Sequence, residues 1–215
     1  MKTRIAVLVS GGGTNLQALI DARDRGELPH GELALVVSNN ADAFAIERAR
    51  KAGIPVALCL REKGAPRADF EARLLDILSE NRIDMIVLAG FMAILSSDFV
   101  ARYPERIINI HPSLIPSFCG EGFYGLRVHQ AALDYGVKVT GATVHYVNEI
   151  PDGGRIIAQK AVDIQPDDTP ETLQRRVMEQ AEWILLPRAT EEVARKINSD
   201  LPRSDKSEFA DITGG

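Results

Sequence analysis

Short apolar runs alternate with amphipathic segments through the first half of this 215-residue chain. Such runs, when turn residues bound them, are typical of strands buried on both faces of a parallel sheet. They are Ile5–Val9, Leu33–Val37, Val56–Leu60, Met85–Ala89 and Ile107–Ile110. The segments between the first four runs carry apolar residues at helical spacing. Strands and helices that alternate in this way predict a right-handed parallel α/β sheet.

The pattern changes after Pro116. Residues 117–125 are rich in glycine and aromatic side chains and are predicted to form a loop. Further along, Ala142–Val147 and Arg155–Val162 flank the turn sequence Pro151-Asp152-Gly153-Gly154. Two strands joined by such a turn predict an antiparallel hairpin, so the sheet should become mixed here.

Two helices are expected in the rest of the chain. Val128–Tyr135 is a short one, and a long one begins at Thr169 and Pro170, a capping residue followed by a first-turn proline. Residues 200–215 are polar without periodicity, which predicts a disordered tail. Apolar residues make up 45% of the chain, enough for one sizeable core. We therefore expect residues 1–199 to form a single domain. Its predicted fold is a Rossmann-like, mostly parallel twisted sheet with helices on both faces and a C-terminal antiparallel hairpin.

Charge and composition disfavour several classes of partner. The net charge is −5 and no run of lysine or arginine occurs, so nucleic acid is not expected as a partner. No segment approaches the roughly 20 apolar residues needed to span a bilayer, and residues 1–9 lack the features of a signal peptide. Cys59 and Cys119 have no CxxC spacing and are expected to be reduced thiols. These features predict a soluble cytoplasmic protein with no membrane partner, either a monomer or a homodimer.

The first predicted strand ends in the glycine-rich sequence Ser10-Gly11-Gly12-Gly13-Thr14-Asn15. Glycines let the backbone approach an anion closely, and the helix that follows offers free N–H groups and the positive end of its dipole. The segment is not a P-loop, because no Gly-Lys-Ser/Thr follows, and Leu16 stands where a dinucleotide fingerprint has its third glycine. We therefore predict a site for a phosphate monoester, with a tight turn that binds nothing as the alternative. The candidate binding residues are Gly12, Gly13, Thr14 and Asn15.

Asn109 and His111 close the fifth predicted strand, and strand alternation puts them on the same face. An amide and an imidazole side by side can both donate to one carbonyl oxygen and stabilise a tetrahedral oxyanion. Asp152 lies in the predicted hairpin turn, which could fold over this site. Its charge would then raise the pKa of His111 and favour the imidazolium. These groups suit acyl transfer from a donor to an amine without a covalent enzyme intermediate. Backbone capping by Asn109 and an ordinary Asp-Gly turn are the structural alternatives.

Other chemistries lack the residues they need. His30, His129 and His145 have no ligand-like spacing, so no metal is expected. No Gly-x-Ser-x-Gly elbow is present, and neither cysteine has a recognisable nucleophile context, which disfavours covalent catalysis. A Rossmann-like nucleotide-binding protein or dehydrogenase is the alternative from a different class. Its second strand would end in an acidic residue, whereas this one ends in Ser38-Asn39-Asn40.

Several specific motifs occur together and in order along the chain. They are Ser10–Asn15, Ala89–Met92 with Ile94-Leu95, Asn109–Pro116, Thr140-Gly141 with Val144-His145, and Asp152–Gly154. With these motifs, from about Arg4 to about Pro187, the chain resembles the folate-dependent phosphoribosylglycinamide formyltransferases of purine synthesis. The fold of that family is a mostly parallel α/β sheet, in agreement with the sheet predicted above.

The resemblance implies an enzyme that transfers the formyl group of 10-formyltetrahydrofolate, its co-substrate, to the amine of phosphoribosylglycinamide. It implies that Asn109, His111 and Asp152 are catalytic, with His111 as the proton donor. It places the substrate phosphate and glycinamide on Gly12, Gly13, Thr14, Asn15 and Glu182. The implied folate-binding residues are Arg67, Met92, Ala93, Ile94, Leu95, Asn109, Asn148, Glu149, Ile150 and Pro151. Residues 148–152 would close over the pterin.

The chain also departs from the family pattern. Ala93 and Ser117 stand where the family usually has basic residues, and Arg127 replaces a common histidine. The Ser117–Tyr124 loop is longer than usual. These departures bear on recognition of the phosphoribosyl group and of the folate tail, and leave the catalytic trio intact.

Three related activities are alternatives. Hydrolases of 10-formyltetrahydrofolate share the Asn/His/Asp core but usually carry an N-terminal regulatory domain, whereas this chain begins at its first strand. Methionyl-tRNA formyltransferases usually add a basic C-terminal domain. Formyltransferases acting on sugar-nucleotide amines are disfavoured because the glycine-rich loop suits a terminal phosphate.

Overall fold

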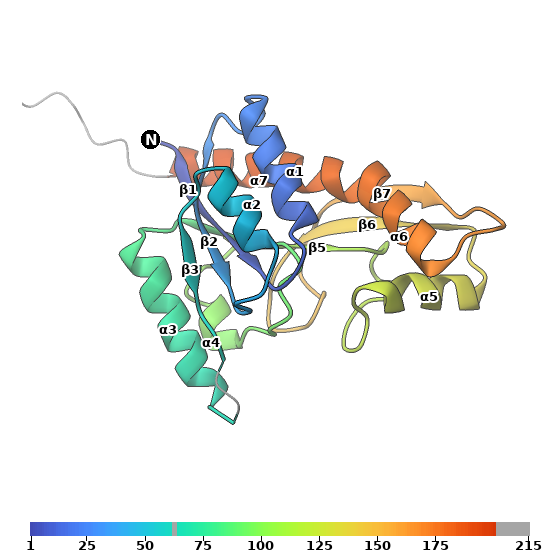
Figure 1. Ribbon diagram of the computed structural model, residues 1–215, viewed down its shortest axis with the longest axis horizontal. Coiled ribbons are helices and arrows are strands. Elements are labelled where there is room, and N and C mark those ends of the chain that lie inside the picture. The colour runs from blue at the N-terminus through green and yellow to red at the C-terminus, as the bar shows by residue number, and fades with distance from the viewer. Residues whose placement is uncertain (62–63, 201–215) are drawn as a thin grey trace, which may run out of the picture.

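The computed structural model describes residues 1–61 and 64–200 (Figure 1). In these residues, seven strands form one sheet in the order β3-β2-β1-β4-β5-β6-β7. The strands are β1 (Thr3–Val9), β2 (Gly31–Ser38), β3 (Val56–Leu58), β4 (Met85–Leu88), β5 (Ile107–His111), β6 (Val139–Tyr146) and β7 (Ile156–Asp163). The first five strands pair in parallel, and β6 pairs antiparallel with both β5 and β7. The predicted mostly parallel sheet with a C-terminal antiparallel hairpin is confirmed.

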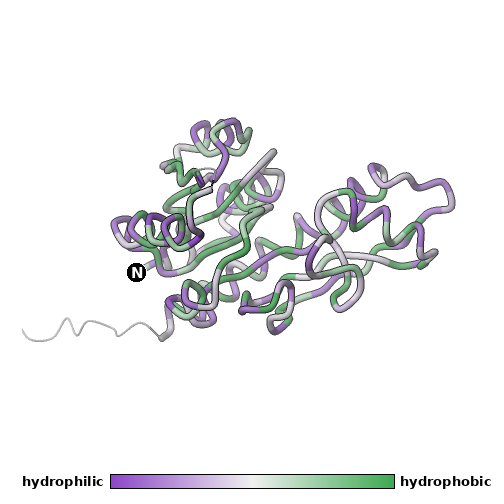
Figure 2. The backbone as a smooth tube through the Cα atoms, turned by 90° about the horizontal axis from the view of Figure 1, so that it is seen from below, coloured by the Kyte–Doolittle hydropathy of each residue, from purple (hydrophilic) through white to green (hydrophobic). Residues whose placement is uncertain are grey.

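Helices cover both faces of this sheet. They are α1 (Thr14–Asp24), α2 (Ala45–Lys51), α3 (Arg67–Glu80), α4 (Ser97–Val100), α5 (Leu126–Tyr135), α6 (Pro170–Val177) and α7 (Trp183–Asp200), with a π-helix (Met178–Glu182) between the last two. In Figure 1, α1, α2 and α7 lie on one side of the sheet and α3 and α4 on the other. Figure 2 shows that hydrophobic residues follow the strands, whereas the outer turns of the helices are largely hydrophilic.

Two apolar clusters, one on each face, follow from the alternation of side chains along the strands. On β1, Ile5 and Val7 belong to the cluster that includes residues of α1, α2 and α7, whereas Ala6 and Leu8 belong to the cluster beneath α3 and α4. All four side chains are completely buried. Both faces need apolar residues, and this explains why the strand reads as a continuous apolar run.

Some elements differ from their predicted form. Strand β3 ends at Leu58 rather than Leu60, and α4 lies in a segment where the sequence pattern indicates no helix. The long helix predicted after Thr169 is interrupted, because α6 passes into the π-helix before α7 begins. Pro187 lies inside α7 and has no N–H for the carbonyl four residues earlier, so the ladder of helical hydrogen bonds is incomplete directly after the π turn.

The predicted start of the C-terminal tail lies at the end of a helix in the structure. Asp200, where the disordered tail was expected to begin, is the last residue of α7. Residues 201–215 lie outside the described residues. None of the helices formed by residues 1–61 and 64–200 has the length and hydropathy needed to cross a membrane.

The order of the strands determines where a ligand can bind. The chain adds β2 and β3 on one side of β1 and then returns to add β4 on the other side. At such a switch point the loops after neighbouring strands diverge and leave a crevice at the carboxyl edge. The glycine-rich loop after β1, the Gly90 segment after β4 and His111 at the end of β5 all lie at this edge.

Candidate active site

A cavity of about 630 Å³ lies at the carboxyl edge of β1, β4 and β5. Most of the predicted site residues line it, namely Thr14, Asn15, Met92, Ala93, Ile94, Leu95, Asn109, His111, Asn148, Glu149, Ile150, Pro151, Asp152 and Glu182. Gly12, Gly13 and Arg67 do not line it. The cavity therefore joins segments that lie far apart in the sequence, from the loop after β1 to the π-helix before α7.

The predicted pair on β5 lies as strand alternation requires. Asn109 and His111 face the same cavity, and their partners across the antiparallel ladder are His145 and Thr143 of β6. The imidazole of His111 is almost completely buried, with 5% of its side chain exposed. Its ring is consequently fixed from several sides rather than free to turn in solvent.

Asp152 is the centre of the polar cluster. Its backbone has φ 54°, the left-handed region, which aspartate tolerates better than most residues. Its two carboxylate oxygens lie 3.4 Å from Nδ1 of His111, 3.4 Å from Nδ2 of Asn109 and 3.5 Å from Nε2 of His145. The backbone N–H of Gly120 donates to the same carboxylate at 2.9 Å. One negative charge thus holds three side chains and a loop together.

The protonation of this cluster differs from the expectation stated above. Burial lowers the pKa of His111 below its usual value, although the charge of Asp152 and the carbonyl of Phe118 both oppose that shift. Asp152 acts in the predicted direction, but the expectation of a net raised pKa for His111 is wrong, because desolvation outweighs the carboxylate. Burial acts to raise the pKa of Asp152, but the hydrogen bond with His145, the His111 ring and the Gly120 N–H together lower it.

His145 is a member of the cluster that was not assigned a role from the sequence. Its Nδ1 must donate to the carbonyl of Tyr146, at 2.8 Å, because a carbonyl only accepts. Its Nε2 then faces Nδ2 of Asn109 at 3.2 Å as well as the carboxylate of Asp152. The neutral ring accepts from Asn109, and the protonated ring donates to Asp152. The only sequence signal for it is its position in the Val144-His145 motif.

The loop after β5 forms a wall of the cavity. The carbonyl of Phe118 accepts a hydrogen bond from Nε2 of His111 at 2.9 Å, and residues 120–125 line the cavity. The same loop supplies the Gly120 N–H to Asp152. The segment whose role could not be assigned from sequence is thus in direct contact with two of the three predicted catalytic side chains.

A second polar group lies at the other end of the cavity. Nδ2 of Asn15, in the first turn of α1, donates to Oε2 of Glu182 at 2.6 Å. Glu182 is the last residue of the π-helix and only 6% of it is exposed. Burial raises the pKa of Glu182 to about 7, and the hydrogen bond from Asn15 opposes this only in part. This carboxyl group can therefore change protonation near neutral pH.

The raised pKa of Glu182 makes the stability of the protein depend on pH. The folded state holds this proton up to about pH 7, whereas the ordinary value is 4.5, so the contribution to stability is present below about pH 4.5 and is lost as pH rises through 7. Replacing Glu182 with Gln should remove this loss, about 1–3 kcal/mol, and flatten the melting temperature between pH 5 and about pH 8. The exposed neighbour Glu179, replaced with Gln, is the control. An unchanged pH dependence in the Glu182 variant would contradict the assignment.

Apolar side chains form the remaining wall. Met92 and Ile94, after β4, and Ile150, before Asp152, are each more than half exposed although they line the cavity. Apolar groups left accessible in a concave site are suited to a flat aromatic ligand. Arg67 is not part of this wall: it is the first residue of α3, its side chain is 51% exposed, and its Nε lies 3.7 Å from Oε1 of Glu71.

The described residues were also searched for side chains that could bind a metal ion together. Among residues 1–61 and 64–200, no group of three or more His, Cys, Asp or Glu side chains is arranged to hold a metal ion. The chemistry that the cavity offers is that of an amide, imidazoles and a carboxylate at one end, and of the first turn of α1 beside a buried glutamate at the other.

Comparison with known proteins finds a matching family and several similar proteins. Residues 3–190 match the family model described as formyl transferase. The phosphoribosylglycinamide formyltransferase of Haemophilus influenzae is 44% identical over 177 residues, which are 82% of this chain and 81% of that protein. The chloroplastic phosphoribosylglycinamide formyltransferase of Arabidopsis thaliana is 40% identical, and 82% of this chain matches 61% of its length. This chain spans only 18% of a third relative, the trifunctional purine biosynthetic protein adenosine-3 of Bos taurus, at 45% identity.

Solved structures share the fold at similar identity. Glycinamide ribonucleotide transformylase 1 from Symbiobacterium toebii has a TM-score of 0.84 and 40% identity, covering 91% of this chain and 89% of that one. The phosphoribosylglycinamide formyltransferase of Coxiella burnetii has a TM-score of 0.82 and 42% identity over the same shares of the two chains. A family match across most of the chain, together with these relatives, shows that the chain belongs to the formyl transferase family.

Proposed function

We propose that this protein is a phosphoribosylglycinamide formyltransferase, which moves a formyl group from 10-formyltetrahydrofolate to the amine of phosphoribosylglycinamide in de novo purine synthesis. The observation that carries the proposal is that one cavity is lined both by Asn109, His111 and Asp152 and by Thr14, Asn15 and Glu182, where Thr14 and Asn15 directly follow the glycines of the loop. The names of the relatives at 40–45% identity support the same acceptor and reaction.

The formyl donor is assigned to the apolar wall. A pterin is a flat heteroaromatic ring, and the accessible side chains of Met92, Ile94 and Ile150 offer it an apolar surface. Asn148 accepts a hydrogen bond at its side-chain oxygen from the N–H of Ile150 at 3.0 Å, which shapes the 148–152 segment beside this surface. The ring would lie there with its formyl group directed at Asn109 and His111.

The acceptor is assigned to the other end of the cavity. The first turn of α1 presents N–H groups without helical partners, which suit the terminal phosphate. Glu182 is hydrogen-bonded to Asn15 of this turn and lines the same cavity as the catalytic cluster, so the glycinamide portion would extend past it. The departures at Ala93 and Ser117 leave the phosphate dependent on backbone donors rather than on lysine or arginine at those two positions.

The transfer requires stabilisation of one oxygen and movement of one proton. As the amine nitrogen forms a bond to the formyl carbon, the formyl oxygen gains negative charge. Asn109 and His111 would donate to it by exchanging their present partners, which are Asp152 and His145 for Asn109 and the Phe118 carbonyl for Nε2 of His111. The bond from the formyl carbon to the folate nitrogen then breaks. The amine loses a proton and the leaving nitrogen gains one, with His111 and Asp152 as the groups that exchange it. Burial lowers the pKa of His111, but a developing oxyanion beside the ring acts in the opposite direction.

The proposed function also leads us to expect particular partners and a particular cellular location. Its partners are the two small-molecule substrates, and neither nucleic acid nor a membrane is required. We place it in the cytoplasm, as a monomer or a homodimer.

The reaction can be tested directly with purified protein. Deformylation of 10-formyl-5,8-dideazafolate or 10-formyltetrahydrofolate is followed by absorbance, with and without phosphoribosylglycinamide. Turnover that requires phosphoribosylglycinamide supports the transferase. Turnover without any amine would assign the protein as a hydrolase instead, and turnover only with a sugar-nucleotide amine would replace the acceptor.

Replacing Gly13 with Val should raise KM for the phosphorylated acceptor about 10- to 100-fold while KM for the folate changes little. Gly13 has φ 72°, and a Cβ there would lie 2.6 Å from Cβ of Ala45, so the loop must move away from α2. Steady-state kinetics with each substrate varied in turn measure the effect. Gly26 has a similar φ with open space around it, and Gly26→Val provides the control for backbone strain alone. Equal losses for both substrates would indicate misfolding rather than a phosphate site.

A further inference from the structure

The carbonyl groups of the glycine-rich loop face helix α2. The carbonyl of Gly11 accepts a hydrogen bond from the N–H of Ala45 at 3.0 Å. The carbonyl of Gly12 accepts one from Nε of Arg48 at 2.9 Å. In a trans peptide the C=O and the next N–H point in opposite directions. The N–H groups of Gly12 and Gly13 therefore point away from α2, and within the described residues neither has a protein acceptor.

Arg48 is held rigidly in this arrangement. Its Nη1 donates to Oε1 of Gln17 on α1 at 3.1 Å, and its guanidinium carbon lies 5.1 Å from the centre of the Phe44 ring. The planar group is therefore held by a loop carbonyl, by a side-chain amide of α1 and by the aromatic ring at the start of its own helix, α2. A hydrogen bond from a charged donor is stronger than one between neutral groups, so Arg48 is a firm anchor for Gly12.

Arg48 contacts the glycine-rich loop from the side of α2. Arg48 does not line the cavity at the carboxyl edge, but it lines a smaller recess of about 280 Å³ that also includes Gln17 and Thr14. Thr14 lines both spaces. Arg48 can therefore influence a ligand in the cavity only through the loop and through its own positive charge.

Packing of the loop against α2 does not by itself fix the orientation of the loop peptides, which therefore depends on these hydrogen bonds. Gly13 approaches α2 so closely that an added Cβ would lie 2.8 Å from Cα of Ala45 and 3.4 Å from Cδ of Arg48. Contact of this kind fixes the separation of loop and helix but not the rotation of a glycine peptide, since glycine lacks a side chain to restrict it. The Arg48 contact supplies that restriction at the Gly12 carbonyl.

We propose that Arg48 is a positioning residue, which holds the Gly12 carbonyl against α2 and thereby aims the N–H of Gly13 at the phosphate of the acceptor. The inference rests on the proposed function, which puts that phosphate at the loop. Without Arg48 the Gly12–Gly13 peptide is free to rotate, and the donor it presents is no longer fixed. Arg48 contributes to binding of the phosphorylated substrate and not to the chemical step.

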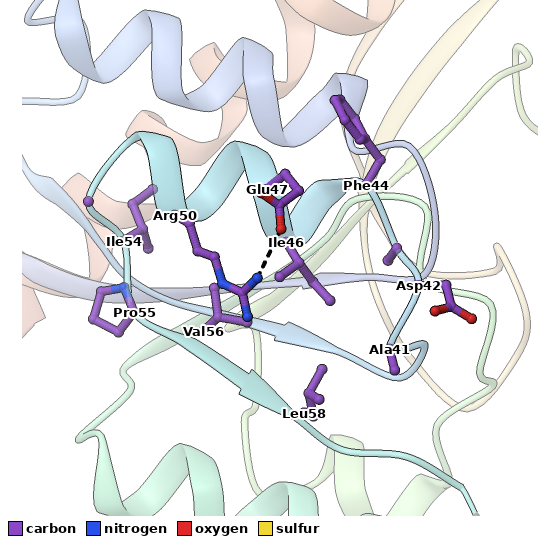
Figure 3. A pocket seen from close by; sticks show the side chains of 12 residues that line it. Ala41, Asp42, Phe44, Ile46, Glu47, Arg50, Ile54, Pro55, Val56 and Leu58 are labelled. Atoms are coloured by element: carbon purple, nitrogen blue, oxygen red, sulfur yellow. Dashed lines mark hydrogen bonds and ion pairs between the residues drawn. The ribbon is translucent and has the colours of Figure 1, made fainter.

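The same helix provides a matched control. Arg50 pairs with Glu47 at 2.9 Å and lies over a separate recess between α2 and β3, as Figure 3 shows. Phe44, at the start of α2, also lines that recess. Replacing Arg50 with Met removes one positive charge from α2 while leaving the contact with Gly12 intact.

The experiment compares the Arg48→Met, Arg48→Lys and Arg50→Met variants with the unaltered protein. For each, kcat/KM is measured with phosphoribosylglycinamide and with the ribosylglycinamide that lacks the phosphate. The ratio of the two values reports what the phosphate contributes. For Arg48→Met we expect this ratio to fall about tenfold, with KM for the formyl donor and kcat at saturation unchanged. For Arg48→Lys the ratio should lie between those of Arg48→Met and the unaltered protein, because a lysine can donate to only one of the two acceptors, the Gly12 carbonyl or Gln17. Arg50→Met should keep the full ratio.

The outcomes separate this inference from the proposed function. A full ratio in Arg48→Met overturns the inference, and a ratio near one in the unaltered protein overturns the assignment of phosphate to the loop. If Arg48→Met does not fold, as judged by thermal melting, Arg48→Lys decides in the same way. A uniform loss with both acceptors and with the formyl donor would mark Arg48 as merely structural and would also overturn the inference.

Discussion

Replacement of His111 with Ala is expected to lower kcat by a factor of about 10²–10⁴, with binding of both substrates retained. The imidazole is fixed by the Phe118 carbonyl at Nε2 and by the Asp152 carboxylate near Nδ1, at the end of the cavity proposed to receive the formyl group. Its removal deletes a donor to the oxyanion and a carrier of the proton at once. Neither loss affects the apolar wall or the glycine-rich loop, so KM values should change little.

Rapid-quench or steady-state kinetics measure the loss of kcat, and fluorescence titration with a folate analogue measures binding. His30 on the surface, which pairs with Glu191, offers a control in which a histidine outside the cavity is replaced by alanine. Turnover within a few-fold of the unaltered enzyme would remove His111 from the mechanism. Loss of folate binding together with activity would point to collapse of the buried cluster instead.

Replacement of Asp152 with Asn is expected to lower kcat about 100-fold or more and to move the pH dependence of the rate. Asparagine keeps the size of the side chain, tolerates φ 54° and still offers an oxygen to the Gly120 N–H. What it removes is the charge beside His111. Since that charge raises the pKa of His111 against the effect of burial, its loss lowers the pKa further. The limb of the pH–rate profile that reports His111 should therefore shift to lower pH.

The full pH–rate profile of both enzymes distinguishes electrostatic control from a purely structural role. Asp134, exposed on α5 and bonded to Gln130, provides the matched Asp→Asn control. A lower rate with an unmoved profile would leave Asp152 as a residue that holds the turn and its loop. A moved profile with a nearly normal rate would show that protonation of His111 does not limit turnover.

Burial of the candidate catalytic cluster has a physical consequence for the proposed reaction. The same desolvation that lowers the pKa of His111 also strengthens its hydrogen bonds and charge interactions, because the surroundings screen them less than water does. Asp152 keeps its negative charge despite burial because four donors or positive partners surround it. The cluster is therefore prepared for a change of charge on the substrate without rearrangement of solvent.

Local sequence was sufficient for the fold and for part of the candidate site. Apolar runs without polar alternation predicted strands covered on both faces, and β1 confirms this, since its residues enter two different clusters. The same-face placement of Asn109 and His111 followed from alternation along one strand. The glycine-rich loop and the Pro151–Gly154 turn were recognised because the backbone requirements of a turn lie in adjacent residues.

Contacts between distant segments could not be derived in this way. The approach of His145 to Asn109 depends on the antiparallel register of β5 and β6, which no short sequence pattern specifies. The hydrogen bond from Arg48 to the Gly12 carbonyl joins residues 36 positions apart. An arginine on a charge-rich helix does not by itself predict such a contact. The interruption of the last helix by a π turn, which brings Glu182 to the cavity, also lacks a local pattern.

What the sequence by itself determined is the set of chemical groups and the edge of the sheet at which they gather. Both depend on periodicity and on short-range backbone geometry, which are written in neighbouring residues. Only the tertiary structure decided the state of those groups. Burial sets the net pKa of His111, and burial also raises the pKa of Glu182. Desolvation and long-range hydrogen bonds depend on which segments meet in space, and that is known only once the chain is folded.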